Sequence, residues 1–435
     1  MRFQYKDTAQ VKENEIIGEG KRIAEYVKHL NTVANRNNYQ DPESSINLPF
    51  DENILNEVLN LKKQLVSNKL KYILNIGIGG SNLGTKAIYD AIYGYTDLLE
   101  PQRFPKIIFA DTTDADYLSH IQNFLKTQIK SSEEIIVNAI SKSGGTTETI
   151  ANLEMLLGFI DNYKTRLVIT TGENSELMEI AQNENIATLF IPKTIGGRYS
   201  VFSTVGLFPL ACANIDVLGV LEGAMQARAE GLEETILENP ALISAIIIYL
   251  QYKDGKIIND NFFFHPELES LGKWYRQLMA ESIGKEHDLN KNTVFTGITP
   301  TVSIGSTDLH SMGQLYLGGP RNKLFTLIHG RHEDSKPKIP TELPLPLTVV
   351  ELEGKKASTI MEAIYEGVKI AYKKQGLPFM EVQLNNIDEN ALGYFLQFKM
   401  IEMMYLGKLL NVNTFDQPNV EDYKLETRKI LQEEN

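Results

Sequence analysis

The sequence predicts an α/β fold with mostly parallel sheets. Short apolar runs alternate with helical patterns along most of the chain, as expected when a crossover helix follows each strand. The runs are apolar throughout rather than alternating, so helices must cover both faces of each sheet. Two runs in the first half end in loops rich in glycine and hydroxyl residues. Right-handed crossovers then produce doubly wound domains, with both loops in one sheet.

The first 64 residues precede this pattern and are predicted to be helical, packing on the larger domain. Apolar residues recur at helical spacing between Ile54 and Leu65, and Asp51 is a suitable cap for that helix. The first α/β unit is then expected over residues 65–210. Its predicted strands lie at 71–77, 106–110, 134–140, 166–170 and 186–191, and its helices at 85–93, 148–159 and 175–183.

A second α/β unit is expected over residues 211–415, followed by a helical arm over residues 416–435. Segment 334–346 carries several prolines and is predicted to be a surface excursion. Helices are predicted at 224–238, 268–280 and 393–410, and strands at 256–264, 323–328 and 348–352.

Composition argues against several classes of function. The 435 residues include 43 Lys plus Arg and 56 Asp plus Glu, a net charge of −13, so a nucleic-acid partner is not expected. The single cysteine, Cys212, lies in an apolar stretch and is expected to be a buried thiol. The longest apolar run, Ala241–Leu250, falls far short of the roughly 20 residues that a membrane span requires. With no signal-peptide pattern at the start, a cytoplasmic protein without a membrane partner is expected.

The loop after the first predicted strand, Gly77–Asn82, suits an anion. Glycines such as Gly80 let backbone N–H groups approach a ligand at a strand-to-helix turn, and Ser81 adds a hydroxyl donor. A dinucleotide fold would need a glycine where Asn82 stands and an acidic residue at a strand end, whereas Asp97 lies in a turn-like stretch. The alternative is a tight structural turn.

The loop after the third predicted strand is rich in hydroxyls. It contains Ser141, Lys142, Ser143 and Thr146, together with two glycines. Hydroxyls and backbone amides complement phosphate oxygens, and the lysine supplies charge. The order of a P-loop is absent, so a nucleoside triphosphate is not expected. A turn that merely caps the next helix is the alternative. Two such loops in one sheet favour a monophosphate site.

Two further segments carry candidate catalytic groups. Arg198 follows Gly197, so a closely approaching backbone can present its guanidinium to a developing oxyanion. The alternative is a salt bridge at the start of a helix. Glu281 lies four residues after Gln277, on the same face of a predicted helix, and a carboxylate there can act as a general base. The alternative is a helix-end carboxylate paired with Lys285.

The remaining candidates are less specific. His310 lies in the segment GSTDLHSMG, and from this segment alone a structural histidine is the commoner interpretation. Near the C-terminus, Asp416 is expected to cap a helix that carries Gln417 and Lys424 on one face. The pair of histidines in HGRH, at 329–332, has no third ligand at a recognisable spacing, so no metal is predicted.

Taken in chain order, these segments resemble the glucose-6-phosphate isomerase (phosphoglucose isomerase) family in its bacterial form. The resemblance covers roughly residues 70–425, and ordered matches are far more specific than one motif. Lys193, Asn419 and a longer segment at 286–303 depart from the family pattern. The matching segments are IGIGGSNLG, SKSGGTTET, IGGRYSVFSTVG, AESIGK, GSTDLHSMGQ and GKLLNVNTFDQPNVEDYK.

The resemblance implies reversible isomerisation of glucose 6-phosphate and fructose 6-phosphate through a cis-enediolate, in glycolysis and gluconeogenesis. It implies that Glu281 moves a proton between C2 and C1, and that Arg198 with Gly197 stabilises the enediolate. His310 would help to open the sugar ring, with Lys424 assisting. The implied substrate and phosphate contacts are Gly80, Ser81, Ser141, Lys142, Ser143, Thr146, Gln277 and Gln417.

The resemblance also implies two sugar-isomerase-type α/β/α sandwich domains, no cofactor, and a homodimer with shared active sites, in which the histidine often comes from the neighbour. Two other classes of protein remain as alternatives. A sugar-phosphate sensor would keep the hydroxyl loops but could lack Glu281, Arg198 and Lys424, and their presence favours an enzyme. An NAD-dependent oxidoreductase would need a complete dinucleotide fingerprint. An isomerase acting on mannose 6-phosphate stays open, because a sugar epimer depends on a few hydroxyl contacts.

Overall fold

The first of two five-stranded sheets is entirely parallel, with the strand order β3-β2-β4-β5-β6. The computed structural model describes residues 1–330, 336–342, 345 and 352–433. Every strand predicted between residues 71 and 191 is confirmed within a residue or two. The strands are β2 (Tyr72–Ile76), β3 (Lys106–Ala110), β4 (Ile135–Ser141), β5 (Leu167–Thr171) and β6 (Ala187–Phe190).

Helices cover both faces of this sheet, as the continuously apolar strands predict. Successive residues of one strand enter different cores: Ile136 packs with one group of helices and Val137 with the other. The helices on the Ile136 side are α3 (Glu52–Leu65), α4 (Leu83–Tyr89) and α8 (Thr204–Cys212), and those on the Val137 side are α5 (Ala115–Gln128), α6 (Thr147–Leu157) and α7 (Glu176–Asn183).

Two predictions about single residues of this region are confirmed, the helix cap at Asp51 and the buried thiol at Cys212. Asp51 caps α3, because its carboxylate accepts hydrogen bonds from the backbone amides of Asn53 and Ile54. Cys212 is fully buried at the end of α8, and this burial raises the pKa of its thiol to about 12. A thiol in that state is a core residue rather than a nucleophile.

The second sheet has the order β1-β12-β11-β7-β10, with only β1 antiparallel. Two of its strands are predicted, and predicted strand 348–352 lies almost entirely outside the described residues. The strands are β1 (Arg2–Gln4), β7 (Ile258–Phe263), β10 (Thr299–Ile304), β11 (Lys323–Gly330) and β12 (Phe379–Leu384). The N-terminal segment is therefore not only helical, since β1 extends the second sheet.

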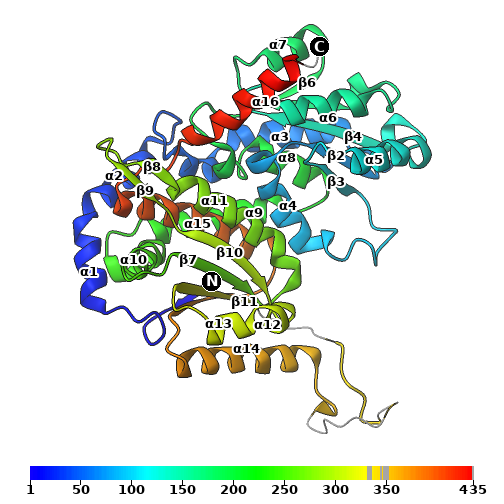
Figure 1. The fold of residues 1–435 in the computed structure, drawn as a ribbon. Coiled ribbons are helices and arrows are strands. Elements are labelled where there is room, and N and C mark those ends of the chain that lie inside the picture. The colour runs from blue at the N-terminus through cyan, green and yellow to red at the C-terminus, as the bar shows by residue number, and fades with distance from the viewer. Residues whose placement is uncertain (331–335, 343–344, 346–351, 434–435) are drawn as a thin grey trace.

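Long helices fill the space between the two sheets (Figure 1). They include α9 (Val217–Gly231), α11 (Glu269–Ile283) and α15 (Glu389–Leu410), and their buried side chains join the same core as the inner face of the first sheet. The predicted helix 224–238 is wrong in position, because α9 ends at Gly231 and Asn239 caps a new helix, α10 (Pro240–Lys253). That helix holds the longest apolar run and is itself buried.

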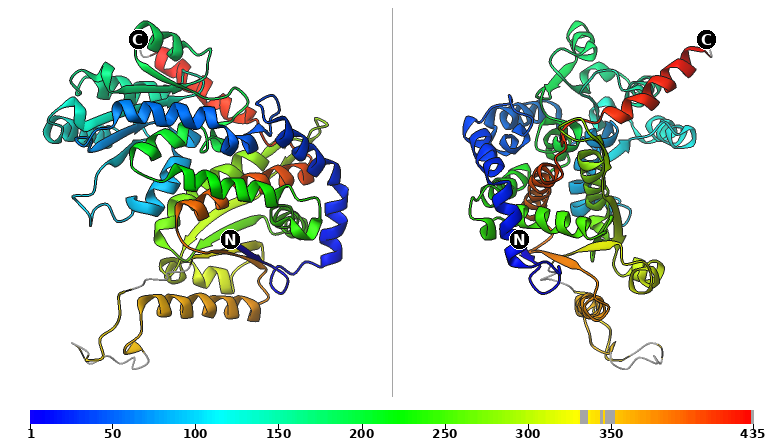
Figure 2. Two further views of the ribbon diagram at one scale, coloured as in Figure 1. Left: turned by 180° about the vertical axis from the view of Figure 1, so that it is seen from behind. Right: turned by 60° about the vertical axis from the view of Figure 1, so that its left-hand side comes forward.

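The outer parts of the molecule complete the architecture (Figure 2). Helices α1 (Glu13–Arg22) and α2 (Ala24–Arg36) run along one edge, and α14 (Ala357–Lys374) packs on the outer face of the second sheet with α12 (Thr307–Ser311) and α13 (Gly313–Gly318). A hairpin of β8 (Lys285–His287) and β9 (Thr293–Thr296) follows α11. Helix α16 (Glu421–Glu433) projects outward to the C-terminus. Within the described ranges, no helix combines the length and apolar character needed to cross a membrane.

Candidate active site

The two hydroxyl loops follow adjacent strands of the first sheet. The chain passes from β2 outward to β3 and then returns to the other side of β2 with β4, so the strand order reverses between β2 and β4. In open parallel sheets, ligands bind outside the carboxyl ends of the strands at such a reversal. Loop 77–82 follows β2 and loop 141–147 follows β4, so the predicted anion loops flank this point.

The first loop makes a close backbone contact with the segment that carries Arg198. A Cβ atom built on Gly80 would lie 2.1 Å from the carbonyl carbon of Gly197, so only glycine fits there. The preceding residue, Gly79, has a φ of 58°, and a Cβ there would lie 3.0 Å from the Gln277 amide nitrogen. These glycines therefore bring three segments together. The close approach beside Arg198 requires the glycine at position 80, because a Cβ on Gly197 would lie 3.4 Å from Gly80, which is an ordinary contact.

Arg198 is the most heavily bonded side chain of this region. Only 1% of it is exposed, although it carries a full positive charge. A buried guanidinium is stable only when its donors are satisfied. Arg198 donates to the hydroxyl of Ser282, the carboxylate of Glu281, the side-chain oxygen of Gln417, and the backbone carbonyls of Thr414 and Asp416. One side chain thus joins the first α/β unit to α11 and to the C-terminal segment.

Glu281 receives a donor on each carboxylate oxygen. Gln277 Nε2 donates to Oε1 at 2.9 Å, which confirms the shared helix face, and Arg198 Nη1 donates to Oε2 at 3.1 Å. The side chain of Glu281 keeps 29% exposure, whereas Arg198 has almost none. An oriented, partly accessible carboxylate beside a fixed guanidinium has the arrangement that a general base and an oxyanion stabiliser require.

Lys285 holds this region together in a way that the sequence did not predict. It does not pair with the carboxylate of Glu281, because that carboxylate faces Arg198. Its amine donates instead to the backbone carbonyl of Glu281 at 2.8 Å and forms an ion pair with Asp416 at 3.0 Å. Desolvation is the main influence on the Lys285 amine and lowers its pKa.

The expected helix cap at Asp416 is therefore wrong. The Asp416 carboxylate is occupied by Lys285 and Asn413. Pro418 starts a short 3-10 turn after Gln417, and α16 begins only at Glu421. Gln417 therefore precedes α16. Its side chain accepts a hydrogen bond from Arg198 and does not share a helix face with Lys424.

The hydroxyl loop after β4 is open to solvent at its tip. Ser141 and Thr146 share a hydrogen bond of 2.9 Å between their hydroxyls, and Thr146 does not cap α6 with its side chain. A role limited to capping is therefore wrong for this threonine. Ser143 is exposed, and Lys142 is partly buried, which lowers the pKa of its amine by desolvation. Ser81 lies at the end of the neighbouring loop, without a hydrogen bond from its side chain among the described residues.

A cavity of about 450 Å³ lies between this loop and α16. The loop contributes Ser143, Gly145 and Thr146, and the helix contributes Lys424 and Arg428. Lys424 thus lies beside the hydroxyl loop, although its amine is paired with Glu421 at 2.7 Å. A volume of this size suits a small ligand. Two cations and several hydroxyl groups among its lining residues are suitable partners for an anion, beside the carboxylates of Glu148 and Glu421.

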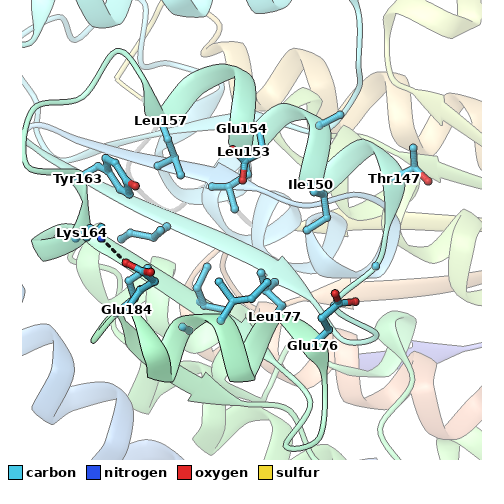
Figure 3. Close-up of a pocket in the computed structure, with 18 residues that line it drawn as sticks. Thr147, Ile150, Leu153, Glu154, Leu157, Tyr163, Lys164, Glu176, Leu177 and Glu184 are labelled. Carbon is cyan, nitrogen blue, oxygen red and sulfur yellow. Dashed lines mark hydrogen bonds and ion pairs between the residues drawn. The ribbon is translucent and has the colours of Figure 1, made fainter. Parts of the chain in front are cut away.

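A second cavity, of about 600 Å³, lies behind the same loop between α6 and α7. Eight of its 18 lining residues are leucine or isoleucine, and Figure 3 shows the Lys164–Glu184 ion pair at one end. Its charged side chains are three glutamates and one lysine, and that lysine is paired with Glu184. The cavity beside α16, with two cations and the hydroxyl loop, is therefore the better candidate for a sugar phosphate.

His310 lies apart from the other candidates. It is exposed on α12, after β10 of the second sheet, and it has no hydrogen bond or ion pair among the described residues. Glu281 and Arg198 instead bond to each other, from the last turn of α11 and from the 3-10 turn Gly197–Tyr199 after β6. The single chain therefore brings together Gly80, Gly197, Arg198, Gln277, Glu281 and Gln417, and leaves His310 outside this group.

A family model for phosphoglucose isomerase matches residues 57–322. The chain belongs to the phosphoglucose isomerase family. It is 33% identical to a glucose-6-phosphate isomerase of Methanocaldococcus jannaschii over 368 residues, which cover 84% of this chain and 85% of that relative. It is 32% identical to a glucose-6-phosphate isomerase of Rubrobacter xylanophilus, over 88% of this chain and 87% of that relative. The resemblance drawn from the motifs is confirmed.

Solved structures share the same fold. A hypothetical protein from Thermus thermophilus superposes with a TM-score of 0.84 at 28% identity, over 99% of both chains. A glucose-6-phosphate isomerase from Chlamydia trachomatis superposes with a TM-score of 0.80 at 19% identity, over 99% of this chain and 88% of that one. The predicted fold class, two α/β units with mostly parallel sheets of the phosphoglucose isomerase kind, is confirmed.

Several side chains in contact with the predicted group were not found from the sequence. Ser282 and Lys285 follow Glu281 within one helical turn, so their nearness to the candidate base was a usable signal. Thr414 and Asp416 act through backbone carbonyls, for which the residue type gives no signal. Arg428 lies one helical turn beyond Lys424, and this spacing was also available.

Proposed function

We propose that this protein interconverts glucose 6-phosphate and fructose 6-phosphate, with Glu281 as the base and Arg198 as the oxyanion stabiliser. Membership of the phosphoglucose isomerase family supports the reaction. The roles are supported chiefly by one observation: Glu281 accepts hydrogen bonds from Gln277 and Arg198, and Gln277 lies against Gly79 of the glycine loop after β2. A group for proton transfer, Glu281, and a group for charge stabilisation, Arg198, then lie side by side.

The proposed chemistry begins with the open-chain aldose. Its C2 proton is acidified by the C1 carbonyl, and the Glu281 carboxylate removes it. The negative charge that develops on O1 and O2 of the cis-enediolate is stabilised by the Arg198 guanidinium, with the backbone at Gly197 beside it. Returning the proton to C1 gives the ketose. Because the guanidinium is already held by its other partners, little reorganisation is needed during the reaction.

The phosphate is proposed to bind Ser81, Ser141, Lys142, Ser143 and Thr146. It lies remote from the carbon that reacts, so its binding energy serves to orient the substrate. Gly80 and Gln277 are proposed to border the sugar at the junction of the loops, together with Gln417. No step of this proposal calls for a metal or a cofactor.

His310 is proposed to open the sugar ring from the neighbouring subunit of a homodimer, with Lys424 assisting. Its exposure, and the lack of a hydrogen bond or ion pair between it and the groups around Glu281 within the described residues, support this arrangement. A histidine that serves its own chain would be expected to contact those groups. Each active site would then need Glu281 from one chain and His310 from the other.

The division of the chain that we propose follows the sheets, except that β1 of the N-terminal segment pairs with β12 of the second domain. An N-terminal segment, 1–64, precedes a first domain, 65–210, and a second domain, 211–415, and 416–435 form a C-terminal arm. A cytoplasmic enzyme of glycolysis and gluconeogenesis is proposed, as its substrates suggest.

The reaction is tested by a coupled assay on the purified protein with fructose 6-phosphate and EDTA, in which a dehydrogenase reports glucose 6-phosphate. Turnover at about 10 per second or more, a common enzyme range, is expected. Saturable binding of the sugar phosphate without turnover would instead indicate a sensor. Mannose 6-phosphate in the same assay, with its own coupling enzymes, tests the choice of epimer.

Sharing of the active site is tested by mixing two inactive variants, Glu281→Gln and His310→Gln. In a shared site, the mixed dimer has one site with both native residues, so activity returns after subunit exchange. If both residues come from one chain, every site in the mixture keeps one substitution and activity stays lost. Light scattering on the unmixed protein establishes that a dimer is present.

A further inference from the structure

Helix α16 presents a second cation to the hydroxyl loop. Arg428 lies four residues after Lys424, on the same face, and both line the cavity that Ser143, Gly145 and Thr146 enclose from the other side. The Arg428 guanidinium already reaches the loop, because its Nη2 lies 3.4 Å from the carbonyl oxygen of Gly145. The helix is therefore tied to the loop by this arginine.

The cations of α16 differ in how they are neutralised. Lys424 is paired with Glu421 at 2.7 Å, and Lys429 is paired with Glu426 at 2.6 Å. Arg428 makes no ion pair within the part of the chain that the structure describes, although the Glu421 and Glu148 carboxylates also line the cavity. Arg428 is therefore the cation of α16 that has no carboxylate partner among the described residues and can bind an anion in this cavity.

The loop itself supplies one more cation. The Lys142 amine is partly buried and has no ion pair among the described residues. A phosphate monoester carries nearly two negative charges at neutral pH. One lysine balances only about half of that charge, and a guanidinium can meet two phosphate oxygens at once.

We infer that Arg428 is a substrate-binding residue that contacts the phosphate of the sugar phosphate from α16. The inference rests on the proposed function for its substrate, and its ligand is the phosphate group itself. In the free protein the guanidinium rests on the Gly145 carbonyl, and it exchanges this neutral acceptor for the dianion when the substrate enters. The arginine then holds α16 over the occupied cavity.

Three substitutions separate this role from a structural one. Arg428→Ala removes both charge and donors, Arg428→Lys keeps the charge, and Arg428→Gln keeps a donor for the Gly145 carbonyl without charge. We expect KM for fructose 6-phosphate to rise about tenfold in the Ala and Gln variants and less in the Lys variant. The value of kcat should change less than twofold, since the phosphate contact is the same in ground state and transition state.

The matched control is Lys429→Ala, one residue further along the helix. Lys429 is exposed, does not line the cavity and has its own partner in Glu426. Its KM is expected to stay within twofold of the native value. An equal rise in KM for both alanine variants would overturn the inference, because it would report general loss of positive charge. A native KM in Arg428→Gln would also overturn it, because the role of Arg428 would then be to hold α16 to the Gly145 carbonyl through an uncharged donor.

Calorimetric titration with inorganic phosphate tests the contact without any turnover. Weaker phosphate binding in Arg428→Ala, with native binding in Lys429→Ala, is the expected result. If the native protein binds phosphate in this way but does not turn over fructose 6-phosphate, the proposed reaction fails and the role of Arg428 stands. If turnover is normal and phosphate binding is unchanged in Arg428→Ala, the role of Arg428 fails alone.

Discussion

Two regions of the candidate site differ in how far the protein fixes them without a substrate. At the centre, Arg198 and Glu281 are joined directly and have partners on every charged atom. At the phosphate end, Lys142 and Arg428 lack a carboxylate partner among the described residues, and α16 has no buried residue. Groups that stabilise a transition state must be fixed in advance, whereas groups that bind a dianion can be ordered by it.

The largest effect is expected at the centre. Glu281→Gln keeps the shape and the hydrogen bond from Arg198 but removes the base, so kcat should fall about 10³-fold. Binding of inorganic phosphate should be unchanged, because the loop after β4 is not altered. Turnover close to native in this variant would remove Glu281 from its assigned role.

Gly80→Ala tests whether the centre depends on backbone packing. A Cβ there would meet the Gly197 backbone at 2.1 Å, so the two loops must separate and Arg198 must move. A displacement of that kind is expected to lower kcat about 10²-fold. The melting temperature should fall by several degrees, measured by calorimetry, since overpacking costs about 1–3 kcal/mol.

Gly196→Ala is the control for this substitution. A Cβ on Gly196 meets no atom within 4 Å, and its backbone φ of −72° is open to alanine. Its kcat and melting temperature are expected to stay near native. Similar losses in both variants would show that the loop tolerates no change, whatever the contact with Gly80.

At the phosphate end, Lys142→Ala should weaken a phosphorylated inhibitor by about tenfold, an effect of roughly 1.4 kcal/mol. An unphosphorylated sugar should be affected far less, since it lacks the group that the amine contacts. Equal weakening of the two ligands in competition assays would mean that Lys142 does not bind the phosphate.

The same lysine predicts a dependence of phosphate binding on pH. Burial lowers the pKa of free Lys142 below its ordinary 10.5, whereas a bound phosphate stabilises the charged amine. Above a pH of about 6, where the phosphate is a dianion, phosphate affinity is therefore full below the pKa of free Lys142 and falls as the pH rises through it. Lys142→Arg should keep its affinity over this range, because arginine stays charged. An identical alkaline loss in that variant would contradict the assignment.

The smallest effect is expected at Lys424. Its amine is already paired with Glu421 on an exposed helix, and such pairs contribute about 1 kcal/mol or less. Glu421→Gln should free the amine and lower KM for fructose 6-phosphate about twofold, whereas Lys424→Met should raise it by a few fold. A rise in KM in Glu421→Gln would mean that the pair orders α16 rather than competing with the substrate.

The elements that were predicted correctly are those whose pattern lies within a short stretch of sequence. The strands of the first sheet are short, apolar throughout and bounded by turns, so their positions were found. Strand β10 was not predicted, because Pro300 and several hydroxyl residues interrupt its apolar pattern. Strand β1 is only three residues long, and it forms because β12 lies beside it. The second sheet therefore depends on pairing partners that no window of sequence contains.

The candidate site divides in the same way. The pair Gln277 and Glu281 follows from helical spacing, and the hydroxyl loop from its composition. The contacts of Arg198 with the C-terminal segment span more than two hundred residues, and the ion pair of Lys285 with Asp416 spans 131. The contacts of Arg198 exist only once both units have packed, and the contact of Lys285 exists only once the C-terminal segment lies beside it. The incorrect helix cap at Asp416 arose because a local rule was applied to a residue with a distant partner.

The wide separation of the Arg198 partners along the chain has a consequence for how activity is acquired. Its hydrogen bonds join the first unit, α11 and residues 414–417, so none of these parts can build the catalytic centre alone. Recovery of turnover during refolding therefore reports that the first unit, α11 and residues 414–417 have packed together, whereas recovery of circular dichroism reports only the helices and strands.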